Sequence, residues 1–595
     1  MNINLKHTVF ASFVAAMMPL CQSCSLEEEN PGGFTMDNLA TSVEAYKALV
    51  NQTFFGMERH LYGTEYYMMF SEGDTDLWTY RANINSSYTP YFWFDAGASP
   101  STTHTTNMWN AIYDGIGSCN LAIDEAASVP FKSDAERNYQ LAIARFLRAV
   151  YYFNAVEQFG AVTVITEPAK TVDYSPTRTA PLEIYRNLII PDLEFAVEWL
   201  EKGTDATCTT PTKKAALGML AKACLQTREY GTDEFLQKAL DAATLLIQDC
   251  ESGGSAYGAY MYPTFEEVFL EANNMENKEA LWKHRWISGG SSNGNWKLNR
   301  NDEQFLCNLS HFGAWQDTQE NRLTWDGDAE GMFMPTQHLL SLFVQEDGSL
   351  DPRFHASFST EWLCNKAFTW DANTQANYNK DASVVGQSIN VGEKAVKIVM
   401  PQDEDYDREV ADKATLTYLL VDYRDVYDDE SRNVKMELNG RENHFRYFYP
   451  SLCKHNSSNY TVANASRMRN GNLNATFIMR MAEVYLIAAE ADLYLHGGSN
   501  AMQYINKVRA RAGANALSGV PTVRMILDER GRELCGEYCR FNDLKRTGMF
   551  KDASYLNQTH PDLGRYFRPE YALRPIPQSY IQSISNGDSY QNPGY

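Results

Sequence analysis

The sequence predicts a mostly α-helical protein whose helical scaffold is interrupted by a large irregular, loop-rich lobe. Two observations support this prediction. Apolar residues recur at spacings of three and four over long segments near both ends of the chain, as on the buried face of an amphipathic helix. Between them, residues from about 251 to 470 lack this period and are rich in Gly, Asn, Asp, Tyr and Trp.

Six helical segments are expected in the first part of the scaffold, from about residue 39 to 250. They cover roughly 39–62, 107–128, 134–159, 181–202, 211–228 and 233–250. In 134–159, Phe146, Ala149, Val150 and Phe153 fall on one stripe, which favours a core-facing side. Short connections favour antiparallel neighbours. The helix pairs resemble tetratricopeptide (TPR) units in length but lack that repeat's full pattern, so the scaffold is TPR-like by resemblance only.

The second part of the scaffold is expected from about residue 473 to 595. Its helices cover roughly 473–496, 499–512 and 521–538, with Gly497 and Gly513 as suitable helix ends. The lobe between the two parts contains short strand-like runs, Ala280–Ile287 and Ala395–Val399. Because a structureless stretch of that length is implausible in a compact protein, we expect a folded lobe laid against the helices. We therefore predict one mature domain, residues 24–595.

Residues 1–23 are predicted to be a lipoprotein signal peptide. Lys6 precedes a mostly apolar run, Thr8–Leu20, that is too short to span a membrane. Ser23 is the small residue that processing requires before an acylated cysteine, so Cys24 is the expected lipid anchor. The acidic stretch Ser25–Pro31 resembles the tether of surface-exposed lipoproteins. Since more than one acyl chain gives stable attachment, the protein should stay on its membrane.

Composition excludes several classes of protein. A net charge of −23 and a pI near 5 argue against nucleic-acid binding, which needs a basic face. Beyond Cys21 and Cys24, nine cysteines remain without a CxxC spacing, and we expect buried free thiols. A bridge between Cys535 and Cys539 is the alternative. Asp403, Asp405 and Asp407 alternate as calcium ligands do but lack the required Gly and Glu. No metal site and no cofactor are predicted.

Charged residues near the C-terminus recur at helical spacing and are expected to form ion pairs within the framework. They are Arg480, Glu483, Glu490, Glu529, Arg530, Arg532, Glu533, Arg540 and Asp543.

Aromatic residues gather in two segments without helical periodicity, at 74–95 and within the lobe. Sugars present apolar C–H faces ringed by hydroxyl groups, so their recognition favours rigid aromatic platforms beside Asn, Asp and Arg. Packing inside the protein is the alternative role for each tryptophan. The candidate ligand-binding residues are Asp76, Trp78, Arg81, Asn83, Tyr91, Trp93, Trp286, Trp296 and Trp315.

A linked set of short motifs covers nearly the whole chain. It comprises Met108–Tyr113 with Cys119 and Asn120, Ala144–Ala149 with Phe159 and Gly160, Thr212–Ala216, Ile478–Ala491, Ile505–Gly513, Asp528–Leu534, Arg540, Asp543–Gly548, Leu573–Pro577 and Gln591–Tyr595. In this order, the motifs resemble those of the SusD/RagB family of bacterial outer-membrane nutrient-binding lipoproteins. Thr163, where the family usually has Pro, and Arg574, where an aromatic residue is common, are departures at framework positions.

The resemblance implies a SusD-like fold and a binding protein that is not an enzyme. It should face the cell exterior from the outer membrane, bind glycans and deliver them to a TonB-dependent (SusC-like) transporter. Peptide capture is the alternative within the family, and a glycoside hydrolase is the alternative outside it. Gly290–Gly294 matches the G-x-S-x-G motif of hydrolases, but Asn295–Arg300 is not the apolar helix that should follow.

Overall fold

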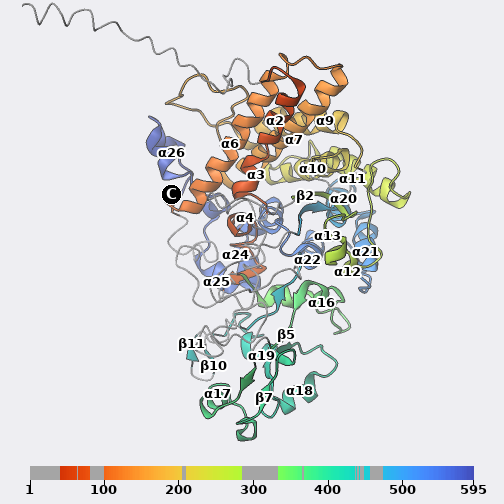
Figure 1. Ribbon diagram of the computed structural model, residues 1–595, viewed down its shortest axis with the longest axis vertical. Coiled ribbons are helices and arrows are strands. Elements are labelled where there is room, and N and C mark those ends of the chain that lie inside the picture. The colour runs from red at the N-terminus through yellow and green to blue at the C-terminus, as the bar shows by residue number, and fades with distance from the viewer. Residues whose placement is uncertain are drawn as a thin grey trace, which may run out of the picture.

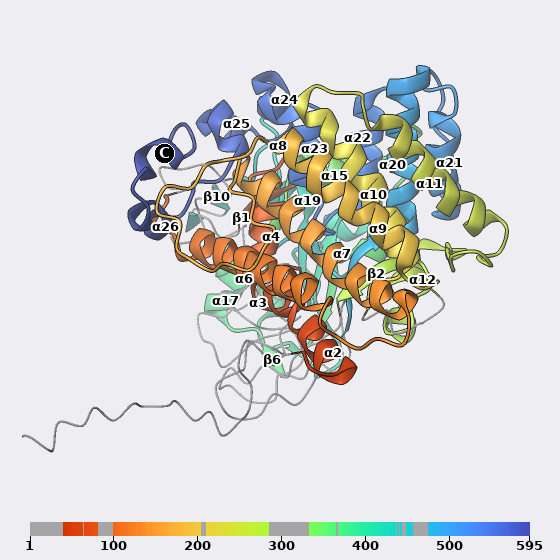
Figure 2. The ribbon, with the colours of Figure 1, turned by 90° about the horizontal axis from the view of Figure 1, so that it is seen from above.

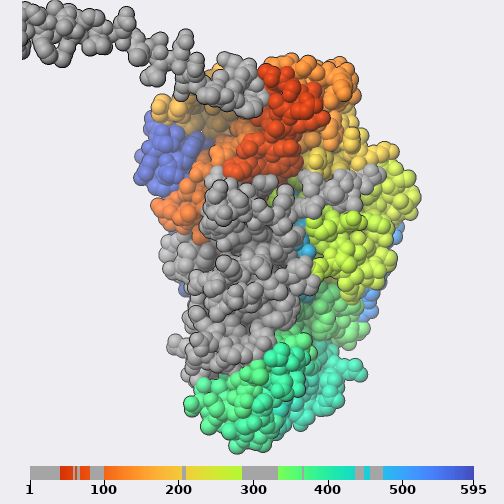
Figure 3. Space-filling view, viewed as in Figure 1, coloured from red at the N-terminus to blue at the C-terminus, as the bar shows by residue number. Residues whose placement is uncertain are grey.

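The computed structural model describes residues 40–62, 65–80, 99–203, 210–284, 333–364, 367–435, 437–438, 441–442, 448–455 and 474–595. Over these residues the chain is mostly helical, as predicted. Helices from both ends of the sequence gather in one part of the molecule, and a lobe of short strands and helices lies at the opposite end (Figure 1). The space-filling view shows this lobe, in green and teal, far from the red and orange N-terminal helices (Figure 3).

The first half of the chain forms helices close to the predicted positions. They are α2 (Val43–Gln52), α3 (Phe55–His60), α4 (Glu65–Ser71), α6 (Thr103–Glu125), α7 (Asp134–Phe159), α8 (Pro181–Ile184), η3 (Tyr185–Ile189), α9 (Ile190–Trp199), α10 (Lys213–Gln226), η4 (Thr227–Tyr230) and α11 (Leu236–Glu251). The expected helix 39–62 is divided into α2 and α3. The expected helix 181–202 contains a π-helical turn, η3, before Pro191. Pro191 has no N–H to donate to the preceding turn, which accounts for the widening.

These helices pack in sequence order and then join the C-terminal block. Helix α6 packs on α7, α7 on α9, α9 on α10 and α10 on α11. Helix α11 then packs on α20 (Met481–His496), which packs on α21 (Ala501–Arg511). Figure 2 shows this row from α6 to α21. The two helical parts of the sequence therefore form one continuous scaffold with the pairwise stacking of helical repeats.

The C-terminal block also contains shorter helices. They are α22 (Val523–Leu534), α23 (Arg540–Arg546), η9 (Met549–Lys551), α24 (Ala553–Thr559), α25 (Pro561–Tyr566), η10 (Pro569–Ala572), α26 (Gln578–Ser583) and α27 (Gly587–Tyr590). Gly497 and Gly513 take positive φ just beyond α20 and α21, as expected of helix ends. The predicted start of the first helix at 473 was wrong, because Thr476–Arg480 is a strand, β13.

The described strands form small sheets; the first strand lies among the N-terminal helices, and most of the others lie with short helices between the two helical blocks. The strands are β1 (Trp78–Tyr80), β2 (Ala280–His284), β3 (Phe333–Pro335), β4 (Phe358–Ser359), β5 (Glu361–Leu363), β6 (Phe368–Thr369), β7 (Ser388–Ile389), β8 (Lys394–Val399), β9 (Leu419–Asp422), β10 (Glu437–Leu438), β11 (Arg441–Glu442), β12 (Ser451–Leu452) and β13. The helices are α12 (Phe265–Phe269), α13 (Glu271–Asn274), α15 (Gln337–Leu342), α16 (Arg353–Ser357), α17 (Ala372–Asn377), η7 (Ala382–Val384), α18 (Tyr406–Asp412) and α19 (Tyr423–Val426).

The largest sheet of the lobe among the described strands has the order β5-β8-β9. Strands β5 and β8 are antiparallel, whereas β8 and β9 are parallel, with Val396 opposite Leu419. A parallel pair needs a crossover connection, which α18 supplies. The predicted strand at 395–399 is confirmed as β8, and the run that begins at Ala280 is confirmed as β2 over Ala280–His284.

The main core is continuous from the helical scaffold into the lobe. Its largest fully buried side chains include Trp78, Trp282, Trp362 and Trp370. The predicted free thiols are confirmed for Cys119, Cys224, Cys250, Cys364, Cys453, Cys535 and Cys539, of which all but Cys250 and Cys453 are fully buried. Cys24, Cys208 and Cys307 lie outside the described residues. The prediction of one mature domain over 24–595 stays a prediction.

Candidate ligand-binding site

Two pairs of strands hold the ends of the segments that carry the aromatic candidates. Strands β1 and β3 are antiparallel, with Tyr80 opposite Phe333. The chain therefore leaves toward residues 81–93 at the point where it returns from Trp315. Strands β2 and β13 are also antiparallel, with His284 opposite Thr476, so the chain leaves toward Trp286 beside β13. The two aromatic-rich stretches, far apart in sequence, thus begin or end on paired strands.

Strand β12 joins these two pairs into one packed region. It pairs with β4, and Phe358 of β4 contacts Trp78 of β1 at a ring separation of 6.5 Å. Beyond β12, the His455 ring packs edge-on against Phe477 of β13 at 4.5 Å, and its carbonyl accepts a hydrogen bond from Asn474. We call β1, β2, β3, β12 and β13 the stem region. Any surface formed by the segments that leave it is positioned by these strands.

Asp76 and Trp78, two of the predicted ligand contacts, are completely buried where the chain enters the stem region. The indole of Trp78 donates to Glu72 Oε2 at 2.9 Å and packs against Phe333. Asp76 accepts two hydrogen bonds from the Arg540 guanidinium, at 2.7 and 2.6 Å, and one from the Tyr555 hydroxyl at 2.5 Å. Their contacts give both residues a structural role, in which they position the start of the 81–98 segment.

The carboxyl groups of Asp76 and Glu72 differ because Asp76 forms a bidentate pair with Arg540, whereas at Glu72 the effect of burial outweighs that of the same guanidinium. Burial opposes ionisation of Asp76, but Arg540 and His338 hold its pKa well below the usual range. Burial raises the pKa of Glu72 to about 7, since its partners are mainly the Trp78 indole and the Cys539 amide. Asp76 is therefore a fixed anion, whereas Glu72 changes its protonation near neutral pH.

The other predicted ligand contacts, Arg81, Asn83, Tyr91, Trp93, Trp286, Trp296 and Trp315, lie outside the described residues, as does the G-x-S-x-G motif at 290–294. The tryptophans that the structure does describe in the lobe serve the core. Trp282 packs edge-on against Phe146 at 4.8 Å. Trp370 donates its indole N–H to the Thr417 carbonyl at 2.6 Å. The alternative role, packing inside the protein, therefore holds for Trp282, Trp362 and Trp370.

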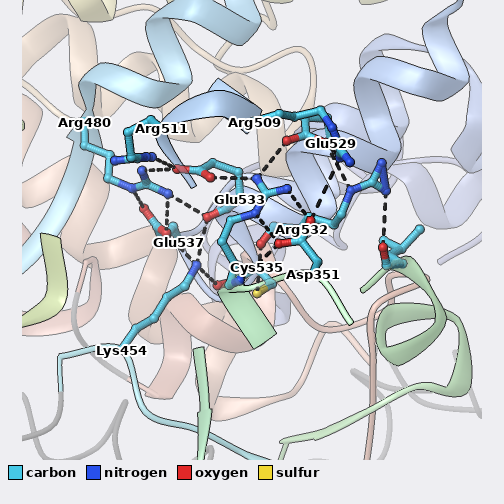
Figure 4. Close-up of polar contacts among 12 residues, drawn as sticks. Asp351, Lys454, Arg480, Arg509, Arg511, Glu529, Arg532, Glu533, Cys535 and Glu537 are labelled. Carbon is cyan, nitrogen blue, oxygen red and sulfur yellow. Dashed lines mark hydrogen bonds and ion pairs between the residues drawn. The ribbon is translucent and has the colours of Figure 1, made fainter. Parts of the chain in front are cut away.

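A buried network of ion pairs fixes the stem region to α22 and confirms the predicted framework role of the C-terminal charges (Figure 4). Arg480, the last residue of β13, donates to Glu533 at 2.6 Å and to Glu537 at 2.7 Å. Lys454, just after β12, donates to Glu537 at 2.8 Å and to two backbone carbonyls at the end of α22. Because both cations are buried, each needs these acceptors. The network thus orients β12 and β13 together.

The acidic partners in this network are held as anions. Burial by itself would raise their pKa values, but the surrounding guanidinium and ammonium groups reverse the effect. The pKa of Glu529 is lowered to about 2, chiefly by Arg353, and that of Glu537 to about 2, chiefly by Arg480. The pKa of Glu533 lies well below its usual range for the same reason. The network therefore stays fully charged at ordinary pH.

Sequence reasoning missed several residues that position the candidate site. Glu72, His338 and Lys454 are isolated polar residues next to apolar runs, and no spacing connects them to their partners. The available signal was the placement of Glu72 directly after the apolar helix α4, since a carboxylate there needs a buried partner.

Two further findings bear on the class of protein. Within the described parts of the chain, no cluster of three or more His, Cys, Asp or Glu side chains is arranged to hold a metal ion. Among those same residues, no helix combines the length and the apolar character that crossing a membrane requires.

Comparison with known proteins identifies the family. A model described as the SusD family matches residues 278–595, which is more than half of the chain. The chain belongs to the SusD family. A second model, described as "Starch-binding associating with outer membrane", matches residues 34–225, so family members associate with the outer membrane. The family resemblance of the sequence motifs is thereby confirmed.

Individual SusD-family proteins are similar over most of the chain. A SusD-like protein of Formosa agariphila is 24% identical over 496 residues, which cover 82% of this chain and 79% of the relative. A solved SusD homologue of Bacteroides thetaiotaomicron has a TM-score of 0.68 at 18% identity, covering 94% of this chain and 98% of the other. A surface glycan-binding protein A of the same organism, solved with laminarihexaose, has a TM-score of 0.60 at 18% identity, covering 93% and 100%. These structures share the SusD-like fold.

Proposed function

We propose that this protein is a surface-exposed outer-membrane lipoprotein that binds glycans and delivers them to a TonB-dependent, SusC-like transporter. Its role is capture without a catalytic step. The observation that carries the proposal is the stem region, where the aromatic-rich segments 81–98 and 285–332 begin or end on paired strands. A rigid base beneath such segments lets aromatic rings meet a sugar without a large loss of conformational freedom.

The class of ligand is supported by chemistry and by relatives. Arg81, Asn83, Tyr91, Trp93, Trp286, Trp296 and Trp315 supply the ring faces and hydrogen-bonding groups that suit carbohydrates. Similar proteins include one solved with laminarihexaose and another described as laminarin binding. We assign ligand contact to these seven residues and a positioning role to Asp76 and Trp78.

Binding of purified protein to plant, host and microbial polysaccharides tests the proposal. Alanine substitution of an exposed aromatic contact should cost on the order of 2 kcal/mol, or about thirtyfold in affinity, with an unchanged melting temperature. Trp370→Ala is a matched control, because removal of this buried ring should lower the melting temperature instead. Release of shortened sugars would contradict a purely binding role. Retention of peptides but of no glycan would favour the alternative of peptide capture.

The membrane anchor is a separate part of the proposal. Removal of residues 1–23 would leave Cys24 as the acylated N-terminus, followed by an acidic tether. Cys24→Ala should release the protein from the membrane, because the acyl chains supply the attachment. External protease should digest the wild-type protein on intact cells. A variant that stayed membrane-bound and equally accessible would show that Cys24 is not the anchor.

The proposed transporter partner follows from the tethered geometry. A weak binding site retains little ligand by itself, but tethering the protein beside a pore raises the effective concentration of the site there to about millimolar. The continuous helical scaffold from α6 to α21 offers a rigid docking surface, while the segments leaving the stem region remain for the ligand. Purification of the lipidated protein from gently solubilised outer membranes should recover a TonB-dependent transporter with it. Recovery of the protein alone would count against a stable complex.

A further inference from the structure

A pocket of about 320 Å³ lies apart from the stem region, between α15, the end of α21 and α22. Its lining comes from three segments, 341–351, 509–517 and 525–532, of which the first is distant in sequence from the other two. Pockets for small molecules begin at about 300 Å³ and combine an apolar wall with a few fixed polar groups. This pocket has both components.

The polar floor of the pocket is held in place before any ligand arrives. Arg509 and Arg532 both bind the buried carboxylate of Glu529, at 2.7 and 3.0 Å (Figure 4). At the rim, the Gln345 side-chain oxygen accepts the Asn515 backbone N–H at 2.7 Å, and the Asn515 amide donates to Asp347 at 2.8 Å. These bonds fix the positions of the guanidinium and amide groups, as a preorganised site requires.

Donor capacity remains on the two arginines. Among the residues that the structure describes, Nη2 of Arg532 has no hydrogen-bond partner, and its Nη1 makes only a long contact of 3.4 Å with the Leu342 carbonyl. Nη2 of Arg509 reaches only Gln345 Oε1, at 3.5 Å. A guanidinium has five N–H donors, so both groups can still donate to oxygen atoms inside the pocket.

The charge and shape of the lining distinguish between kinds of ligand. Three acidic residues, Glu346, Asp351 and Asp528, also line the pocket, and their carboxylates would repel an anion. Hydroxyl groups both donate and accept, so they match a lining that carries both kinds of group. Leu342, Leu517 and Met525 provide apolar surface for C–H groups. The volume suits about one or two sugar rings.

We propose that this pocket is a second binding site, for a small neutral sugar, formed by the helical scaffold itself. It is separate from the segments that leave the stem region, and it does not depend on the function proposed for them. Its contacts are the donors of Arg509 and Arg532, acceptors at the rim, and the apolar wall.

Ligand-observed saturation-transfer NMR on the purified protein tests the site, with glucose, galactose, mannose and glucuronate as probes. We expect millimolar binding of at least one neutral hexose and weaker binding of glucuronate. Ala516→Trp should fill the pocket from its exposed rim without touching the ion pairs, and weaken binding at least tenfold. Ala169→Trp, at an exposed alanine outside the pocket, is the matched control and should bind as the wild type does.

A second variant covers the case in which Ala516→Trp fails to fold. Arg532→Lys keeps the positive charge but removes the forked donors, and it should also weaken binding. The triple variant W286A/W296A/W315A should leave the hexose signal unchanged, because these residues belong to the other proposed site. The proposal is overturned if no neutral hexose binds, if both pocket variants bind normally, if the triple variant abolishes the signal, or if glucuronate binds more tightly than the hexoses.

Discussion

Single residues tie the start of one aromatic-rich segment to the far end of the chain. Asp76 and Arg540 are 464 positions apart, yet their side chains form a buried bidentate pair. Strand β1 begins two residues after Asp76, so this pair fixes where the segment beyond Tyr80 begins. A buried carboxylate without its cation is costly, which makes the pair a requirement of the folded state.

Arg540→Met should destabilise the protein by about 3–5 kcal/mol, because Asp76 would remain buried without its main cation. The midpoint of urea unfolding measures the effect. Arg186→Met is the control, since its pair with Glu234 is solvent-exposed and should contribute nothing measurable. Equal midpoints for Arg540→Met and the wild type would show that Asp76 does not depend on this pair.

Lys380 serves as an internal cation of the lobe. Its ammonium donates at 2.8 Å to each of three backbone carbonyls, of Lys413, Leu416 and Tyr418. The ring of Trp370 lies 5.6 Å from the same nitrogen. Burial, with a contribution from the charge of Lys413, lowers the pKa of Lys380 to about 8. The group remains mainly charged at neutral pH and holds the 413–418 loop.

Lys380→Met should weaken the lobe locally by about 1–3 kcal/mol, because three buried carbonyls lose their common donor. Hydrogen exchange of the amides in and around residues 413–418 should become faster, while that of α7 should not change. Lys551→Met, at an exposed lysine of the C-terminal block, should leave both regions as in the wild type. Unchanged hydrogen exchange near 413–418 would show that Lys380 does not stabilise this loop.

At the scale of elements, helices were predictable and long-range pairings were not. The apolar stripe of α7 gives a local signal, and the helix spans 134–159 as expected. Strand β13 was predicted as helix because its apolar residues, such as Phe477 and Ile478, run directly into α20. Only its pairing with β2 makes it a strand. The same limit applies to the candidate site, since Trp78 shows its aromatic character in the sequence but not its burial.

The end of α22 is shaped by Gly536, which lies against the stem region. Gly536 has φ +75, and a Cβ there would lie 2.3 Å from the Leu452 side chain of β12. Gly536→Ala should cost about 1–3 kcal/mol, from the left-handed conformation and this clash. Leu452→Ala alone leaves a cavity. Leu452→Ala also removes the atoms that clash with the new Cβ. The double variant should therefore lose less free energy of unfolding than the two single variants lose together, as measured by urea unfolding. Strict additivity would show that the clash with Leu452 does not contribute to the loss of stability.

For the whole molecule, stability should depend on pH through two opposing groups of carboxyls and through three buried histidines. Glu72 has a pKa raised by burial to about 7, and the pKa of Glu157 is raised by burial as well, against an ordinary value of 4.5. As pH falls from 8 toward 4.5, the folded state binds these protons before the unfolded state does, so the contribution of these carboxyls to stability increases. Burial lowers the pKa values of His104, His284 and His455 to about 4, so the unfolded state protonates these histidines first and their contribution decreases over the same range. The net charge of −23 also declines in this range, which reduces self-repulsion.

Below about pH 4.5 the carboxyl contribution changes sign. The pKa values of Glu529 and Glu537 are lowered to about 2, so the unfolded state binds these protons first and stability falls as the pH drops further. Glu72→Gln is neutral at every pH and isolates the contribution of Glu72. The free energy of unfolding of the wild type relative to Glu72→Gln, measured with urea, should fall by about 1–3 kcal/mol between pH 5 and 8. A difference between the two proteins that stays constant from pH 5 to 8 would contradict the assignment, because it would mean that Glu72 is already ionised in the folded protein at pH 5.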